Sequence, residues 1–219
     1  MSKNVNTQQN DLAAETTNKI EKFFETNKKK VVAVLVLLAA AAVAIFFWAN
    51  SNAKDEAAAK DAIYPAQAAI SGQNPNYELA LEDLLDVIEQ YGSTTVGNIA
   101  NHYAGVCYLN IGDLDNAEKY LQAYKPVEGS IYAEIIKAQN IGLQGDIAVE
   151  RGDYEKAADL FKQAVEVSDN ELTAPYYLFK QALALNAAGD VEGAKVCYQT
   201  IVEKYPTAAE KEEADDQLF

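Results

Sequence analysis

The sequence predicts an all-α protein: an N-terminal single transmembrane helix, then an α-solenoid of about four helical hairpins and a C-terminal capping helix. Two observations lead to this fold class. One apolar run near the start of the 219-residue chain is long enough to cross a membrane. After it, a pattern of Gly-Asp, a small residue and a large apolar residue returns at spacings of 40 and 37 residues.

The apolar run extends from Val31 to Trp48, directly after three lysines. A helix rises about 1.5 Å per residue, so these eighteen residues cover about 27 Å, close to the roughly 30 Å hydrocarbon core of a bilayer. Three aromatic residues close the run, where an interfacial belt is expected. We therefore predict a tail at residues 1–30, a transmembrane helix at 31–49 and a second domain at 50–219.

The lysines around the run indicate its orientation. Five lie within about twenty residues before it, whereas only Lys54 and Lys60 follow closely. The positive-inside rule then places the tail in the cytoplasm and residues 50–219 on the other side of the membrane. A cleaved signal peptide is the alternative, because the small residues around Ala53 suit a signal peptidase. The length of the run and the thirty residues before it favour an uncleaved anchor.

The tail has two interpretations. A set of five residues falls on one face of a helix that runs from about Asp11 toward Lys30, so the tail could lie as an amphipathic helix along the membrane surface. A partly ordered tail is the alternative. The five residues are Leu12, Thr16, Ile20, Phe23 and Phe24.

The repeated pattern predicts helical hairpins. Gly at 112, 152 and 189 suits the end of a first helix, and the Asp that follows each suits the N-cap of a second helix. Ala at 117, 157 and 194 allows close helix packing, and a large residue four positions later fills the groove between the helices. A weaker copy starts at Tyr77, with Ala80 and Leu84 in the equivalent positions.

Twelve residues before each strong alanine stands another small residue: Gly105, Gly145 or Ala182. Small residues at this spacing on both helices resemble the tetratricopeptide repeat, although the periods exceed the usual length and the early Trp is absent. We expect one long helix from Ser130 to Arg151, and a polar capping helix at 207–218 after Pro206.

Charge and cysteine usage narrow the function classes. Residues 53–219 carry twelve basic and twenty-nine acidic side chains, a net charge of −17, which argues against binding nucleic acid or an anionic membrane surface. Cys107 and Cys197 each lie inside a helical apolar pattern, so buried free thiols are favoured over a disulfide.

No motif indicates catalysis, a metal, a cofactor or a small-molecule substrate. The cluster at Asp113, Asp115 and Asn116 lacks the Gly and Glu that a calcium loop needs, so we interpret it as a helix cap. His102, the only histidine, has no nucleophile motif nearby, so an ordinary helix-surface residue is favoured over a ligand or base. We expect the protein not to be an enzyme.

Repeat arrays of this kind bind partners through a concave surface made by the first helix of each hairpin. The inward positions mix aromatic and acidic residues, which favours an extended or helical partner held by Tyr and Phe contacts with acidic specificity. Lys180 is the only cation among them, so a clamp for a partner's carboxylates is rejected. The same positions also suit packing inside the stack. They are His102, Tyr103, Val106, Asn110, Leu143, Asp146, Glu150, Tyr176, Phe179, Lys180, Leu183 and Asn186.

From Ile20 to the end, this layout resembles the ancillary subunit of the bacterial Sec translocon, with Phe23-Phe24-Glu25-Thr26-Asn27 as the most family-like stretch. The resemblance implies a single-span inner-membrane protein with a periplasmic repeat domain. Its expected partners are Sec translocon subunits and periplasmic chaperones, and the family has no catalytic residues. The repeats are also similar to those of a periplasmic cell-division coordinator. The alternative is therefore a scaffold for another envelope complex, in division or wall synthesis.

Overall fold

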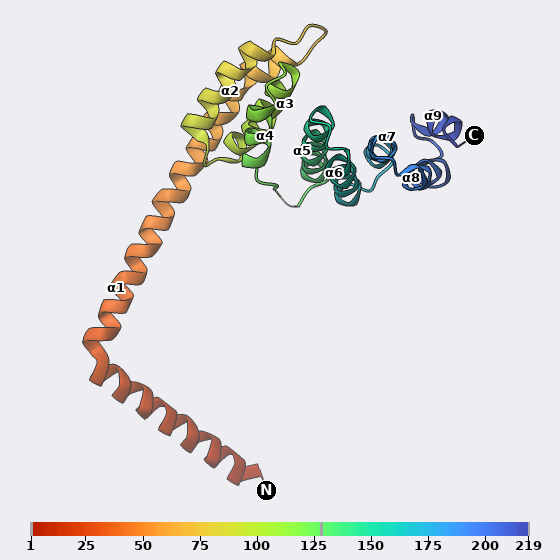
Figure 1. The fold of residues 1–219 in the computed structure, drawn as a ribbon. Coiled ribbons are helices and arrows are strands. Elements are labelled where there is room, and N and C mark those ends of the chain that lie inside the picture. Colours follow the sequence, from red (N-terminus) through yellow and green to blue (C-terminus); the bar gives the residue numbers. More distant parts are fainter. Residues whose placement is uncertain (1, 128, 219) are drawn as a thin grey trace. The chain divides into compact units, whose positions relative to one another are not determined.

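The computed structural model describes the backbone of residues 2–127 and 129–218, and the side chains of residues 22, 23, 25–127 and 129–218. Every regular element in this part of the chain is helical (Figure 1). Two compact units divide the chain, Met1–Lys54 and Asp55–Phe219. The helices are α1 Ser2–Ile70, α2 Tyr77–Tyr91, α3 Thr95–Asn110, α4 Leu114–Ala123, α5 Ile131–Glu150, α6 Tyr154–Val167, α7 Ala174–Ala188, α8 Val191–Lys204 and α9 Lys211–Asp216.

In the first unit, residues 2–54 are helical, and their backbone is kinked at Asn27 (φ −111°, ψ 16°). The Asn27 side-chain amide donates a hydrogen bond to the Phe23 carbonyl at 3.0 Å, next to the three lysines that precede the apolar run. Beyond the kink the helix is long and apolar enough to cross a membrane, and its most apolar window has no buried residue. Of the predicted amphipathic face, the side chains of Leu12, Thr16, Ile20 and Phe24 lie outside the described residues.

In the second unit, the last part of α1 serves as the first helix of the first hairpin. Ala59, Ile63 and Ala66 are buried in one core with residues of α2 and α3. The Glu56 carboxylate also accepts a hydrogen bond from the Thr95 backbone N–H, at the start of α3, at 2.7 Å. The weak copy at Tyr77 therefore has a first helix, which the repeated pattern does not mark.

The predicted turns and caps are confirmed. The glycines at 112, 152 and 189 have φ of +84°, +75° and +90°, in the left-handed region that favours glycine. The next residue in each copy, Asp113, Asp153 or Asp190, accepts a hydrogen bond from a backbone N–H three residues later. Asp113 also binds the side-chain amide of Asn116 at 2.7 Å, so this cluster is a helix cap as expected.

The small residues allow the close helix packing that the pattern predicts. The alanines at 117, 157 and 194 are buried, as are the large residues four positions later. A Cβ added at Gly105 would lie 2.6 Å from Leu121 Cγ, and one at Gly145 would lie 2.7 Å from Phe161 Cε1. Glycine at these two positions therefore lets each first helix approach the second helix of its hairpin.

The third hairpin begins with a long helix, as predicted. The Ser130 hydroxyl accepts a hydrogen bond from the Ala133 backbone N–H at 3.2 Å, and α5 then continues to Glu150. Ile147 of α5 packs against Ala117 and Leu121 of α4, which joins the second hairpin to the third. The prediction of a single helix over this segment is confirmed.

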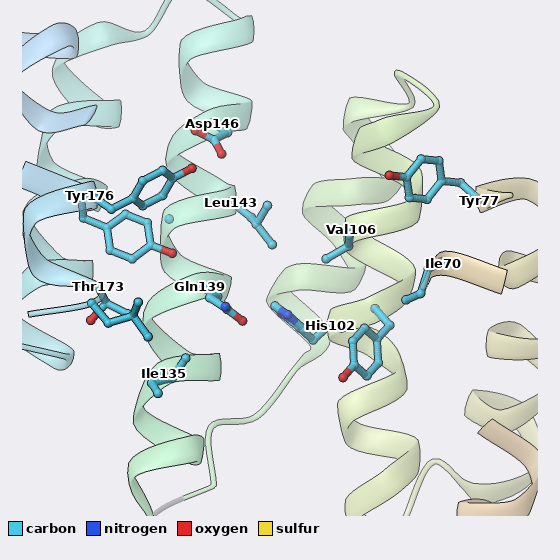
Figure 2. Close-up of a pocket in the computed structure, with 14 residues that line it drawn as sticks. Ile70, Tyr77, His102, Val106, Ile135, Gln139, Leu143, Asp146, Thr173 and Tyr176 are labelled. Carbon is cyan, nitrogen blue, oxygen red and sulfur yellow. The ribbon is translucent and has the colours of Figure 1, made fainter. Parts of the chain in front are cut away.

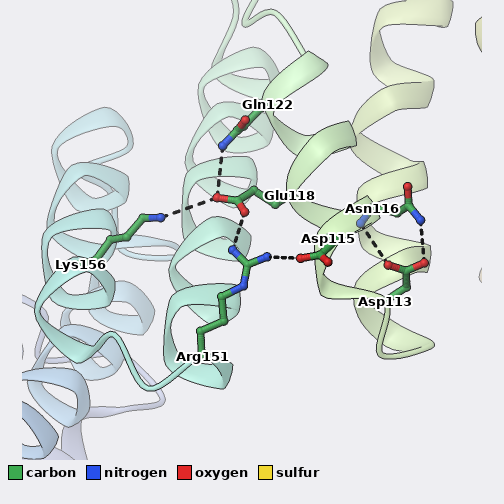
Figure 3. Close-up of polar contacts among 7 residues, drawn as sticks. All are labelled: Asp113, Asp115, Asn116, Glu118, Gln122, Arg151 and Lys156. Atoms are coloured by element: carbon green, nitrogen blue, oxygen red, sulfur yellow. Dashed lines mark hydrogen bonds and ion pairs between the residues drawn. The ribbon is translucent and has the colours of Figure 1, made fainter.

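A network of charged side chains also connects these two hairpins (Figure 3). Arg151, just after α5, binds Asp115 of α4 at 2.8 Å and also pairs with Glu118. Lys156 of α6 lies 3.6 Å from the same Glu118 carboxylate. Hydrogen bonding to Arg151 lowers the pKa of Glu118, so this carboxylate stays charged at pH values below those at which a glutamate is usually protonated.

The capping helix is shorter than predicted. Residues 207–218 were expected to form one helix, but α9 covers only Lys211–Asp216. The Ala208 N–H binds the Tyr205 carbonyl and the Lys211 N–H binds the Ala208 carbonyl, so the chain after Pro206 makes two turns first. Ala214 of α9 is buried against the last hairpin, which closes this end of the core.

Both cysteines are buried and free, as favoured. Cys107 belongs to the core of the first two hairpins and Cys197 to that of the last. Burial raises the pKa of each thiol to about 11, so neither forms a reactive thiolate at neutral pH.

Candidate functional site

The first helices of the hairpins line an open cavity of about 600 Å³, which we call the tyrosine groove (Figure 2). Figure 2 shows Val106 of α3 and Leu143 of α5 pointing toward each other across it. Its lining comes from the first helices α1, α3, α5 and α7, from the first residue of α2 and from the loop before α7. The lining residues are Ile70, Tyr77, His102, Tyr103, Val106, Ile135, Gln139, Gly142, Leu143, Asp146, Leu172, Thr173, Tyr176 and Tyr177.

Helical periodicity aligns these side chains. Residues three, four or seven apart share a helix face, and Ile135, Gln139, Gly142 and Asp146 of α5 follow that spacing. The opposite face of α5 carries small residues such as Gly145, which contacts Phe161 of α6. One face of α5 therefore packs inside its own hairpin while the other lines the groove.

His102 is buried rather than on the helix surface, so that expectation is wrong. Its side chain is 4% exposed, and Nδ1 lies 3.3 Å from the Asn140 amide nitrogen. An amide nitrogen can only donate, so Nδ1 is the acceptor and the neutral ring carries its proton on Nε2. Burial lowers the pKa of His102 to about 4. The ring is therefore uncharged at neutral pH.

Asp146 and Lys180 form an ion pair beside the groove. The Lys180 ammonium lies 2.7 and 2.8 Å from the two carboxylate oxygens and 4.9 Å from the centre of the Tyr176 ring. Burial raises the pKa of Asp146, and Lys180 opposes that shift. For Lys180, burial lowers the pKa but the bonds to Asp146 and Tyr176 outweigh it. The positive charge of Lys180 thus compensates the negative charge of Asp146.

The structure brings together most of the residues predicted to form the binding surface. The groove itself receives His102, Tyr103, Val106, Leu143, Asp146 and Tyr176. Beside it, a second cavity is lined by Asn110, Glu150 and Lys180, and a third by Lys180 and Leu183. The binding role of this surface stays a prediction.

Two predicted residues lie on a different face of α7. Phe179 packs edge-on against Tyr198 of α8, with ring centres 5.6 Å apart. The Asn186 amide lies 3.5 Å from the Tyr198 hydroxyl. Phe179 and Asn186 are seven residues apart, so they share the face of α7 that meets α8 rather than the one that lines the groove.

Sequence reasoning missed several lining residues. Ile135 and Gln139 lie eleven and seven residues before Asp146, so the same helical spacing extended backward would have found them. Leu172 and Thr173 lie before α7, where the Asn170 side chain accepts hydrogen bonds from both backbone N–H groups at 2.9 and 3.0 Å. No periodic signal marks such a loop.

Within the residues whose side chains are described, no three His, Cys, Asp or Glu gather as a metal site would require. Proteins built from tetratricopeptide repeats are generally non-catalytic interaction scaffolds.

The tetratricopeptide repeat family model matches residues 143–209, from the second half of α5 to the loop before α9. This segment contains the glycine turns at 152 and 189 and the buried alanines at 157 and 194. The match and the hairpin packing support a tetratricopeptide-repeat protein, and such repeats support protein–protein interaction. The fold is an all-α solenoid of tetratricopeptide-like hairpins that follows one long apolar N-terminal helix.

Proposed function

We propose that the protein is a membrane-anchored accessory subunit of the Sec translocon whose repeat array links export to periplasmic chaperones. The resemblance from Ile20 onward supports this role, as does the apolar helix that could serve as the anchor. The lysine asymmetry around that helix supports a cytoplasmic N-terminus and a periplasmic array at the inner membrane. The array itself supports protein partners.

The tyrosine groove is the observation that carries this proposal. Aromatic and aliphatic side chains from successive hairpins line one cavity, so a single partner segment would contact several repeats at once. Tyrosine rings are common energetic centres of protein interfaces. Tyr176 is 42% exposed although it lines the groove, which leaves a large apolar surface open to a partner.

Site-directed photo-crosslinking in native membranes tests the proposal. A photoreactive phenylalanine analogue replaces Tyr176 in the full-length protein, and the adducts are identified by mass spectrometry. The matched control places the same analogue at Val196, which is 61% exposed on α8. We expect Sec subunits or periplasmic chaperones to be captured from Tyr176 and not from Val196.

Two results would contradict the proposal in different ways. Equal capture from both positions, or capture from Val196 alone, would move the binding surface away from the groove. Capture of division or wall-synthesis proteins from Tyr176 would keep the groove but replace the translocon role with that of a scaffold for another envelope complex.

A further inference from the structure

We infer that the tyrosine groove binds an extended, uncharged apolar segment that has Lys or Arg directly beside its apolar core. The inference rests on the proposed function, since it describes the kind of partner segment that this groove accepts. Three properties of the groove carry it: a neutral interior, polar side chains without partners, and acidic surroundings.

The interior of the groove has no free charge to offer. Asp146 is its only charged lining residue, and Lys180 binds both of its oxygens. His102 is neutral because burial holds its pKa near 4. A charged side chain buried here would lose water without gaining an opposite charge, which is costly. The segment inside the groove is therefore uncharged.

Three polar lining groups favour an extended segment over a helix. The Gln139 side-chain amide and the hydroxyls of Tyr77 and Tyr103 make no hydrogen bond to the rest of the described chain. An extended segment carries backbone N–H and C=O groups that need partners, whereas a helix satisfies its own. These three side chains can supply donors and acceptors to an extended backbone.

The array that carries the groove is acidic. Residues 53–219 have a net charge of −17. On α5, Glu134 and Glu150 are exposed near the two ends of the helix, with Lys137 as the only basic residue. Basic residues on either side of the bound core would therefore be attracted to the array. This attraction raises the association rate and weakens as salt is added.

Fluorescence anisotropy with model peptides tests this inference on the full-length protein in lipid nanodiscs. The probe is a labelled peptide, Lys-Lys-Leu-Val-Phe-Val-Lys-Lys. One comparison peptide has Glu in place of every Lys, and a second has methyl groups on the backbone nitrogens of the core. We expect each comparison peptide to bind at least about tenfold more weakly than the probe. The Glu-flanked peptide loses the charge attraction, and the N-methylated peptide loses backbone hydrogen bonds.

A pair of variants assigns the binding to the groove. Gln139→Leu removes a polar group from the lining, and Gln163→Leu makes the same change on the exposed surface of α6. Both side chains are exposed, so folding is retained and is checked by circular dichroism. We expect Gln139→Leu to weaken the lysine-flanked peptide about fivefold and Gln163→Leu to leave it unchanged.

The outcomes separate this inference from the proposed function. Equal binding of the Glu-flanked or the N-methylated peptide would overturn the inference, as would equal effects of the two leucine variants. If Tyr176 captures translocon proteins while the lysine-flanked peptide does not bind, the inference fails and the proposed function stands. If the peptide binds as expected while Tyr176 captures none of them, the inference stands and the translocon role fails.

Discussion

At the scale of single residues, small side chains determine how closely the helices of each hairpin can pack. Ala157 and Ala158 are buried on α6, and Phe161 of the same helix lies against Gly145 of α5. Protein interiors are packed closely enough that one added methylene is felt. The repeat register can therefore be tested at one alanine.

Replacing Ala157 with Leu should destabilise the array. Ala157 is fully buried, and overpacking a filled site costs about 1–3 kcal/mol. Thermal unfolding followed by circular dichroism measures the change, with Ala188→Leu at the exposed last residue of α7 as the matched control. An Ala157→Leu variant that melts at the wild-type temperature would refute this packing.

His102 should make stability depend on pH. Its pKa is lowered from 6.5 to about 4 in the folded protein, so the unfolded chain binds the proton more tightly between these values. The stabilisation that the neutral His102 contributes to the folded protein is therefore complete above about pH 6.5 and is lost as the pH falls toward 4. The expected loss over this interval is about 3 kcal/mol.

Urea unfolding of the wild type and a His102→Gln variant measures that loss. Carboxylates titrate in the same interval in both proteins, so the quantity of interest is the difference between the two free energies of unfolding. It should change by about 3 kcal/mol between neutral pH and pH 4. Parallel pH profiles would mean that His102 is not buried as described.

At the scale of elements, the junction between α4 and α5 joins the two halves of the groove. Its apolar contact is small, with Ala117 and Leu121 packed on Ile147, and Arg151 supplements it from the surface. Exposed ion pairs contribute little to stability. We therefore expect the Arg151 ion pairs to resist local opening of this junction and to affect global unfolding little.

Arg151→Gln should accelerate amide hydrogen exchange in α4 and leave α8 unchanged. The change removes the bonds to Asp115 and Glu118 that hold α4 beside α5. Lys195→Gln is the control, because Lys195 pairs with Glu192 inside α8 and bridges no two helices. Identical exchange of α4 in both variants would show that the network does not hold this junction.

Acid should weaken the same junction. Hydrogen bonding to Arg151 lowers the pKa of Glu118. The stabilisation that Glu118 gives to the junction is therefore complete at pH values above the usual glutamate pKa, and it is lost as pH falls through the lowered pKa. The difference in α4 exchange between the wild type and Arg151→Gln should therefore shrink in acid. A difference that grows in acid would contradict this sign.

At the scale of the whole molecule, the topology is open to direct test. Five lysines before the apolar run and two soon after it predict that the repeat array is outside the cytoplasm. A reporter enzyme that is active only outside the cytoplasm, fused after Phe219, should be active. A second reporter, active only inside, should be silent at that position. The reverse pattern in stably expressed fusions would invert the orientation.

The sequence by itself determined the features that depend on local chemistry. Gly152 needs a left-handed backbone, Asp153 caps the next helix and Ala157 packs in the hairpin. Each of these roles depends on neighbours within a few residues, or on a spacing that repeats along the chain. The hairpins, their order and α5 could be predicted for this reason.

Only the tertiary structure decided which of those helix faces meet. Asp146 and Lys180 are thirty-four residues apart, and His102 and Asn140 thirty-eight, so no local pattern pairs them. The end of α1 joins the array because Ala59 is buried against α2 and α3, and no turn motif in the sequence predicts this contact. Side chains at this distance meet only after helices pack, and the pairing of Asp146 with Lys180 then leaves the groove neutral.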